Sequence, residues 1–266
     1  MANLKDTQNE RDDRKIAIDR VGVKNLRFPL RIRDRDQSQQ HTVATVTMAV
    51  DLPHHYKGTH MSRFVEILHA HGRELTVASI AAMPKELLTR LNAQKAHVEM
   101  RFPYFRAKRA PITKAEGLLD YGVIFEVNAE GEDIDYIVTV EVPVTTLCPC
   151  SKAISERGAH NQRGVVTLSV RFRQPIWIED LIELVEASAS SQLYSVLKRP
   201  DEKYVTEAAY DNPVFVEDLV RSVAQKASKH KMIKWFRVEA ENFESIHNHN
   251  AWAVIESTNN KPQADS

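Results

Sequence analysis

The residues best suited to metal chemistry stand in two short polar segments. The chain's only two cysteines, Cys148 and Cys150, lie in TLCPCSKAISERGAHNQRG, and His160 follows in the same segment. The later segment ESIHNHNA supplies His247 and His249. Thiolates and imidazoles are the ligands that zinc and similar borderline metals prefer. The spacing is not that of a structural zinc finger, but an open catalytic site needs only about three protein ligands and a place for water.

A purely structural role is the alternative for each of these residues. A free cysteine is more often a small buried hydrophobic residue than a ligand. The chain has 11 histidines, and most of them are expected to be solvated or hydrogen-bonded. We assign no function to His54, His55, His69, His71, His97 and His230.

Two glutamates are candidates whose default roles are structural. In YDNPVFVEDLVR, the Asn212–Pro213 pair predicts a helix start, so Glu217 and Asp218 fall in or near the first helical turn. Carboxylates there interact favourably with the helix dipole. Glu202 is expected in a loop, KRPDEKYVTE, as a solvated charge.

The segment HYKGTHMSRF has the composition of a weak anion site. It combines small polar residues before an expected helix with two cations, and its candidate residues are Lys57, His60, Ser62 and Arg63. It is not a Walker sequence, and an ordinary helix-capping turn is the alternative.

Composition limits the classes of function. Lys and Arg number 36 against 36 Asp and Glu, so the net charge gives no support for general nucleic-acid or membrane binding. A hydrophobic content of 42% is enough for a core, and no apolar run reaches the roughly 18 residues of a membrane span. The N-terminus lacks the apolar core of a signal peptide. A C-x-C pair is too close for a relaxed disulfide, so we expect a cytoplasmic protein with free, reactive or metal-bound thiols.

The chemistry-bearing segments alternate with periodic segments that predict strands and helices. Residues 26–33 and 44–52 alternate as strands, with Val46, Met48, Val50 and Leu52 on one face. Pro29 favours an edge or a bulge for the first of them. Further strands are expected at 97–107, 118–131, 136–144, 165–172, 233–243 and 251–257, and helices at 62–72, 76–93, 178–190 and 214–230. In the last helix Val216, Leu219, Val220, Val223 and Ala227 form the apolar stripe.

The order of these elements is strand-strand-helix-helix-strand-strand, twice. It predicts an α+β fold with antiparallel sheets and helices on one face. We divide the chain into a disordered tail at 1–18, a first module at 19–130, a second module with the metal site at 131–257, and a disordered tail at 258–266. Exposed strand edges favour closure by oligomerisation.

Taken together, five motifs resemble the GTP cyclohydrolase IB family. They are TLCPCSKAIS, GAHNQRG, NPVFVEDLVR, ESIHNHNA and YKGTHMSRF, and the resemblance runs from about residue 20 to 257. It implies the tunnelling fold, two tandem modules, and a homotetramer with active sites at subunit interfaces. It also implies hydrolytic opening of the guanine imidazole ring of GTP, giving 7,8-dihydroneopterin triphosphate and formate, the first step of tetrahydrofolate and pterin biosynthesis.

The resemblance further implies a divalent metal, zinc or manganese, surrounded by Cys148, His160, Glu202 and His247. Glu217 matches the glutamate that grips the amide and amino edge of a purine or pterin, a task suited to a carboxylate with two accepting oxygens. The catalytic candidates are Cys148, Cys150, His160, His247 and His249, among which ligand and proton-transfer roles stay open.

The triphosphate requires cations, for which we name Lys57, Arg63 and Arg163, with His60 and Ser62 beside them. Two rival functions are carried forward. One is a tunnelling-fold nitrile reductase with a nucleophilic cysteine, which would need NADPH and no metal. The other is a non-catalytic metal-binding oligomer. The physiological metal, the downstream pathway and any regulation by zinc stay open.

Overall fold

The computed structural model of the protein describes residues 8, 10–35 and 39–257. Of the two predicted disordered tails, 1–18 and 258–266, residues 1–7 and 9 of the first and all of the second lie outside these residues. The described part of the first tail pairs with the loop that precedes the first helix. There the amide of Asp12 donates to His55 O at 3.2 Å, and the amide of Lys57 donates to Glu10 O at 3.1 Å.

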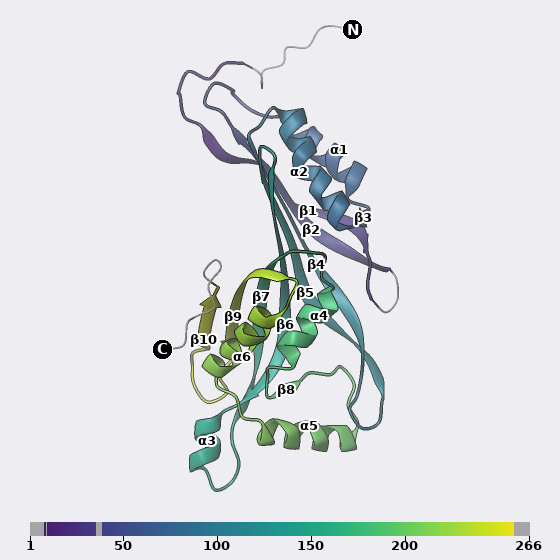
Figure 1. Ribbon diagram of the computed structural model, residues 1–266, viewed down its shortest axis with the longest axis vertical. Helices are drawn as coiled ribbons and strands as arrows, with labels where there is room; N and C mark the ends of the chain where they lie inside the picture. The colour runs from purple at the N-terminus through teal and green to yellow at the C-terminus, as the bar shows by residue number, and fades with distance from the viewer. Residues whose placement is uncertain (1–7, 9, 36–38, 258–266) are drawn as a thin grey trace. The chain divides into compact units, whose positions relative to one another are not determined.

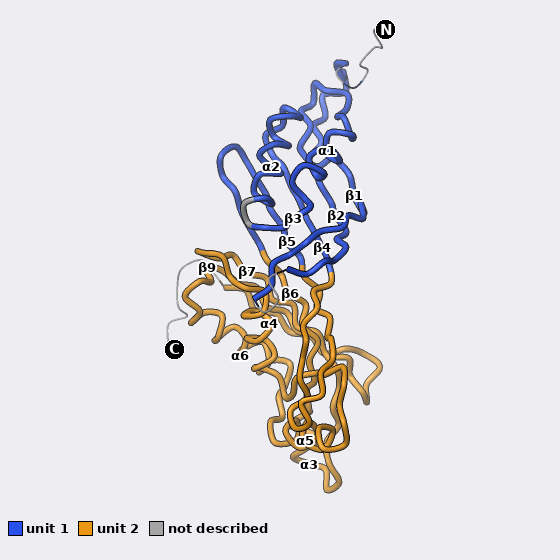
Figure 2. The backbone as a smooth tube through the Cα atoms, turned by 90° about the vertical axis from the view of Figure 1, so that its right-hand side faces the viewer, with its two compact units in different colours: residues 1–102, 124–137 blue, residues 103–123, 138–266 orange. Residues whose placement is uncertain are grey.

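Two compact units divide the chain (Figure 2). Unit 1 comprises residues 1–102 and 124–137, and unit 2 comprises residues 103–123 and 138–266. The boundaries fall inside strands β4 (Lys95–Arg109), β5 (Glu116–Glu130) and β6 (Asp133–Leu147), so these long strands contribute to both units. The modules predicted at 19–130 and 131–257 rest on element order and stay a prediction.

The strands of the described residues form a mainly antiparallel sheet. Besides β4, β5 and β6 they are β1 (Ile18–Ile32), β2 (Gln40–Leu52), β3 (Glu74–Leu75), β7 (Asn161–Phe172), β8 (Ser191–Gln192), β9 (Ile233–Asn242) and β10 (Ala251–Glu256). Their order is β10-β9-β7-β6-β5-β4-β2-β1-β3, with β8 paired to β6. This confirms the predicted α+β class with antiparallel strands.

In unit 1 the helices α1 (Met61–His71) and α2 (Val77–Leu91) cover one face of β1 and β2 (Figure 1). The predicted face of β2, Val46, Met48, Val50 and Leu52, is buried beneath them. Helix α2 begins at a capping box, in which Thr76 Oγ1 accepts from Ser79 N at 3.0 Å and Ser79 Oγ accepts from Thr76 N at 2.9 Å. The alternating burial along β2 and the capped start of α2 together explain why the helices pack on this face of the sheet.

In unit 2 the helices α4 (Ile178–Glu186) and α6 (Val216–Lys229) lie side by side over the sheet (Figure 1). All members of the predicted α6 stripe are buried: Val216, Leu219, Val220, Val223 and Ala227. The facing residues of β6, Val138, Val140, Val142 and Val144, are buried too. The core of unit 2 is therefore the one that the periodicity predicts.

A polar layer lies between α4 and the neighbouring strands. Tyr104 donates to Glu179 at 2.5 Å, while Lys108 and Tyr121 meet Glu186 at 2.5 Å and 2.8 Å. Burial lowers the pKa of Lys108 despite the adjacent Glu186 carboxylate, and burial also raises the pKa of Tyr121. Each of these donors therefore has a carboxylate acceptor, Glu179 for Tyr104 and Glu186 for Lys108 and Tyr121.

The predicted loop around Glu202 is wrong, because residues Arg199–Asp211 form helix α5. This helix is polar on nearly every side, and only Asp201 and Ala209 in it are buried. It has no apolar stripe from which a helix could be predicted. Another helix that was not predicted is the short α3 (Pro149–Ile154), which has no buried residue.

Candidate metal and active site

The loop that follows β6 brings the first cysteine to the histidine of the same segment. β6 and β7 form an antiparallel pair whose last partners are Leu147 and Asn161. One residue beyond that pair, the amide of Cys148 donates to the carbonyl oxygen of His160 at 3.1 Å. We call residues 148–160 the thiol loop. The strand pairing therefore places its two ends side by side.

The Ser151 side chain bridges the two ends of the thiol loop by hydrogen bonds. Its hydroxyl donates to Cys148 O at 3.2 Å and accepts from His160 N at 3.2 Å. Cys148 is the N-cap of α3, its sulfur accepts from Ser151 N at 3.5 Å, and Pro149 occupies the first helical turn. Cys148 is half-buried, whereas Cys150 is exposed. Of the two cysteines, Cys148 is thus the one whose backbone is bonded to His160.

His160 is hydrogen-bonded through one ring nitrogen. Its Nδ1 lies 3.0 Å from Gln162 Oε1 and 3.2 Å from Ser245 Oγ. Ser245 belongs to the segment between β9 and β10, which also carries His247 and His249. The two polar segments, distant in the chain, therefore meet at His160, as the sequence analysis required.

His247 and His249 are exposed on that second segment. Their rings stack with centroids 5.0 Å apart and an interplanar angle of 24°. The segment is anchored where the amide of Phe243 donates to Arg163 O at 2.8 Å. The Arg163 side chain is exposed on β7. Its position next to this anchor is compatible with the predicted contact to an anionic substrate.

Glu217 lies in the first turn of α6, as predicted, beside Asp218. The helix is preceded by Val214, whose amide donates to Leu147 O at 3.0 Å. Leu147 is the residue before Cys148, so the start of α6 is tied to the start of the thiol loop. Glu217 itself is exposed and available to a ligand.

Glu202 is exposed in the first turn of α5. Its neighbour Asp201 is fully buried and holds the β4–β5 turn, where its Oδ1 accepts from the amides of Ile112 and Thr113, each at 2.8 Å. Burial would raise the pKa of Asp201, but these bonds and the one from the Thr113 hydroxyl outweigh it and hold the pKa well below its usual range. At the other end of α5, Lys152 of α3 contacts the Tyr210 carbonyl.

Lys57, His60, Ser62 and Arg63 all belong to unit 1. Lys57 Nζ pairs with Glu10 at 2.9 Å, and Arg63 donates to Arg90 O at 2.7 Å. His60 is the N-cap residue of α1 without a side-chain capping bond, and Ser62 is exposed in the first turn. The four residues thus surround a helix start, as predicted, and the two cations have protein partners.

Across residues 8, 10–35 and 39–257, no three His, Cys, Asp or Glu side chains gather closely enough to hold a metal ion. The donor set nevertheless suits a divalent cation. Cys148 and His160 stand at adjoining backbone positions, and the bond at Nδ1 leaves His160 Nε2 as the nitrogen available to a metal. Glu202 is exposed, and so is His247, whose ring is stacked on the equally exposed His249.

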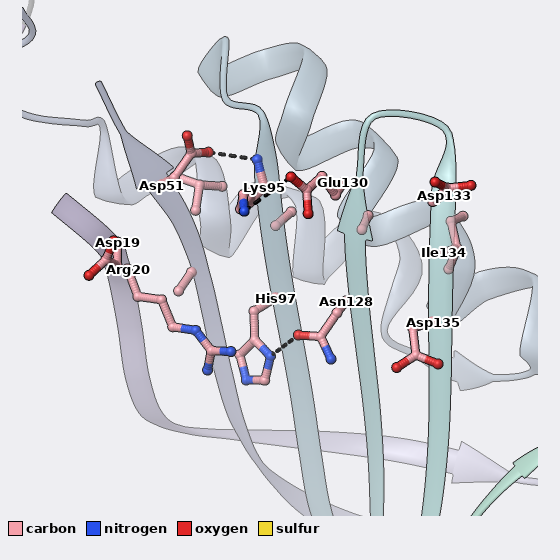
Figure 3. Close-up of a pocket in the computed structure, with 14 residues that line it drawn as sticks. Asp19, Arg20, Asp51, Lys95, His97, Asn128, Glu130, Asp133, Ile134 and Asp135 are labelled. Atoms are coloured by element: carbon pink, nitrogen blue, oxygen red, sulfur yellow. Dashed lines mark hydrogen bonds and ion pairs between the residues drawn. The ribbon is translucent and has the colours of Figure 1, made fainter. Parts of the chain in front are cut away.

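Unit 1 contains a pocket of about 350 Å³ that sequence reasoning missed (Figure 3). It contains none of the predicted site residues. The buried His97 meets Asn128 Oδ1 at 2.8 Å, and Asn128 Nδ2 donates to Glu126 at 2.9 Å. Lys95 and Glu130 form an ion pair at 3.0 Å beside it. In the sequence this pocket is marked only by polar residues near strand ends. Ordinary solvent-exposed strand ends have the same pattern, so the pocket could not be predicted from it.

The sequence matches the family model described as type I GTP cyclohydrolase folE2 over residues 4–253. The chain belongs to this family. A FolE2 relative named GTP cyclohydrolase FolE2, from Akkermansia muciniphila, is 65% identical over 259 residues, which cover 96% of this chain and 98% of the relative. Another of that name, from Methylococcus capsulatus, is 58% identical over 253 residues, covering 95% of this chain and 94% of the relative.

Membership of the FolE2 family confirms the motif resemblance at the level of a type I GTP cyclohydrolase. Solved structures add the fold. Uricase from Arthrobacter globiformis aligns with a TM-score of 0.52 at 9% identity, covering 93% of this chain and 95% of the uricase. Urate oxidase from Bacillus sp. TB-90 aligns with a TM-score of 0.56 at 8% identity, covering 91% and 99%. These likenesses show the tunnelling fold and nothing of the chemistry.

None of the helices in the described residues combines the length and apolar character that crossing a bilayer requires.

Proposed function

We propose that this FolE2 chain opens the guanine ring of GTP at a divalent-metal site built on the thiol loop, as a member of the IB subclass. Family membership makes the chain a GTP cyclohydrolase of folate biosynthesis, producing 7,8-dihydroneopterin triphosphate and formate. The observation that supports the location is the bond between Cys148 N and His160 O, with Ser245 reaching the same histidine.

Cys148 and His160 would supply the first two metal ligands, and Glu202 and His247 would complete the set. Thiolate, imidazole and carboxylate together suit zinc or manganese. When bound, such an ion lowers the pKa of water to about 7 and so supplies a hydroxide-like nucleophile at neutral pH. Carbon 8 of guanine is poorly electrophilic, so the reaction needs this activation.

Glu217 would orient the base. An ionised carboxylate accepts two hydrogen bonds, which matches the N1–H and the exocyclic amine of guanine. The tie between Val214 and Leu147 positions the first turn of α6 beside the thiol loop, so a base held by Glu217 can present its imidazole ring to Cys148 and His160. This hydrogen bond supports the view that Glu217 and the thiol loop belong to one site, in which the base is bound and its ring is opened.

With His247 among the metal ligands, His249 and Cys150 are the groups left for proton transfer. Ring opening and formate release both require protons at ring nitrogens, which histidine supplies near neutral pH. His249 is exposed and its ring stacks on that of His247, so it can move toward a substrate without rearranging the core. Cys150 is exposed and one residue from the ligand thiol.

Lys57, Arg63 and Arg163, with His60 and Ser62, would bind the triphosphate. Lys57 and Arg63 would exchange Glu10 and Arg90 O for phosphate oxygens, which accept charge-assisted hydrogen bonds from cationic donors. We expect a homotetramer whose active sites lie at subunit interfaces, so that residues of one copy complete the site of another.

The direct test is to incubate purified, manganese- or zinc-loaded protein with GTP, and to measure formate together with the fluorescent pterin formed after oxidation. We expect stoichiometric amounts of the two products. Metal-replete protein that leaves GTP unchanged would refute the proposal. NADPH oxidation with a 7-deazaguanine nitrile would indicate the reductase alternative, which the family match already disfavours.

A further inference from the structure

Thr146 and Gln162 form a buried polar pair beneath His160. They are directly opposite each other in the β6–β7 register, one residue inside the strand ends. Thr146 is 0% exposed and Gln162 is 8% exposed. Gln162 Nε2 donates to Thr146 Oγ1 at 2.9 Å. The glutamine amide therefore has its nitrogen directed at the threonine and its oxygen directed elsewhere.

That oxygen faces the imidazole. Gln162 Oε1 lies 3.0 Å from His160 Nδ1, and Ser245 Oγ lies 3.2 Å from the same nitrogen. An amide oxygen can only accept a hydrogen bond, so the proton must be on Nδ1 of the histidine. A neutral imidazole protonated at Nδ1 has its lone pair at Nε2. With the amide nitrogen bonded to Thr146, the amide oxygen is the atom that faces His160, and this arrangement leaves Nε2 of the histidine free.

We propose that Gln162, oriented by Thr146, is a positioning residue that holds His160 in the Nδ1–H tautomer and so presents Nε2 to the divalent cation. This inference rests on the proposed role of His160 as a metal ligand. Partners of this kind fix the tautomer and ring orientation of metal-binding histidines, and their loss typically costs about 10- to 100-fold in metal affinity.

A merely structural pair would behave differently. Thr146 and Gln162 could simply satisfy each other inside the sheet, and their removal would then lower stability alone. The positioning role predicts a change in the protonated nitrogen of His160 even in metal-free protein. Substitutions that keep an acceptor at position 162 should preserve the tautomer, whatever they do to stability.

The test uses two matched pairs of variants in the full-length protein. Gln162→Met keeps the length of the side chain and removes the acceptor, while Gln162→Glu keeps an accepting oxygen. Thr146→Val removes the hydroxyl with little change in shape, while Thr146→Ser retains it. If Gln162→Met fails to fold, the threonine pair carries the test alone.

Two readouts are needed. In metal-free protein with 15N-labelled histidine, ring-nitrogen shifts report which nitrogen of His160 is protonated, with His160→Ala as the assignment reference. Competition of Zn²⁺ or Co²⁺ with a chelator gives metal affinity. We expect Gln162→Met and Thr146→Val to lose the Nδ1–H preference and weaken metal binding, the former by about 10- to 100-fold. Gln162→Glu and Thr146→Ser should keep the Nδ1–H preference of the wild type, and Thr146→Ser should keep its metal affinity as well.

An unchanged tautomer and unchanged metal affinity in both Gln162→Met and Thr146→Val would overturn the inference, whatever the GTP assay shows. A wild-type protein that leaves GTP intact, while its Nδ1 proton and its metal affinity still depend on Gln162, would count against the proposed function and would support the positioning role.

Discussion

The amide of Val214 donates to the carbonyl oxygen of Leu147 across 3.0 Å, and so joins the start of α6 to the residue before Cys148. Val214 and Leu147 are far apart in the chain, and neither carries a reactive side chain. Their bond nevertheless brings the backbone just before Glu217, which would bind the base, to the backbone just before Cys148, which would bind the metal. Substitutions on the two sides of this bond should therefore impair different steps of one reaction.

Glu217→Gln should lower kcat/KM for GTP by roughly 100-fold, since an amide cannot accept both hydrogen bonds from guanine and bonds to charged groups contribute about 1.5–3 kcal/mol. Metal content should stay at the wild-type level. The matched control is Asp218→Asn. Asp218 lies in the same turn but pairs with Arg221 at 2.9 Å, and its loss should change kcat/KM less than twofold. Equal effects of the two substitutions would remove the base-binding role.

Cys148→Ala should abolish both metal binding and formate release while leaving the circular dichroism spectrum and the oligomer unchanged. Cys148 is the N-cap of α3, its sulfur accepts from Ser151 N and its backbone is bonded to His160, whereas Cys150 is exposed in the first turn of the helix. Cys150→Ala should therefore retain stoichiometric metal in elemental analysis. A Cys148→Ala protein with wild-type activity would exclude the thiol as a ligand.

Asp201→Asn should lower the thermal midpoint at neutral pH. The folded-state pKa of Asp201 is held below the unfolded value, so its contribution to stability is present above about pH 4 and is lost as the pH falls further. The difference in midpoint between wild type and variant should accordingly shrink on acidification. Asp211→Asn, at the exposed end of the same helix, serves as the control. If the difference in thermal midpoint between wild type and Asp201→Asn did not vary with pH, the stabilising role of the ionised Asp201 carboxylate would be contradicted.

Gly22→Ala should destabilise the protein by about 2 kcal/mol or more, because an added Cβ would lie 2.0 Å from the backbone oxygen of Met48 on the paired strand. A backbone atom cannot rotate away as a side chain can. Gly58→Ala is the comparison, since its Cβ would meet only Gln8, at 3.5 Å or more, and its effect should stay within about 0.5 kcal/mol. Chemical denaturation of both variants measures the two costs, and equal costs would argue against the steric account.

Glu186→Gln should cost about 3 kcal/mol of unfolding free energy, since it leaves the half-buried Lys108 ammonium facing a neutral amide. The double variant Lys108→Met/Glu186→Gln should lose less than the sum of the two single variants. Urea denaturation of all four proteins closes the cycle, and strictly additive losses would show that the two groups do not interact.

The sequence predicts most of the fold because apolar periodicity reports burial directly. The face of β2 and the stripe of α6 match the structure residue by residue. Helix α5 was not predicted because it has no apolar face. It is held instead by hydrogen bonds from the β4–β5 turn to Asp201 in its first turn. Contacts between residues 89 positions apart, such as Asp201 with Ile112, leave no local pattern.

The sequence predicted which residue types form the candidate site, but only part of how they contact one another. Two cysteines, a histidine and a paired strand on either side are enough to suggest that Cys148 and His160 meet. Thr146, Gln162 and Ser245 could not be singled out, because one hydroxyl or amide among many acquires its role only from the register of β6 against β7.

The thiol loop has a further consequence for engineering. Cys148 and His160 are positioned by the strands that frame the loop, and the span between them has exposed residues at Ser155, Glu156 and Arg157. A peptide tag or a fluorophore attachment site inserted between Glu156 and Arg157 should hence be accommodated at the rim of the reaction centre. An insertion there would leave intact the strand pair that frames the loop and the backbone bond between Cys148 and His160.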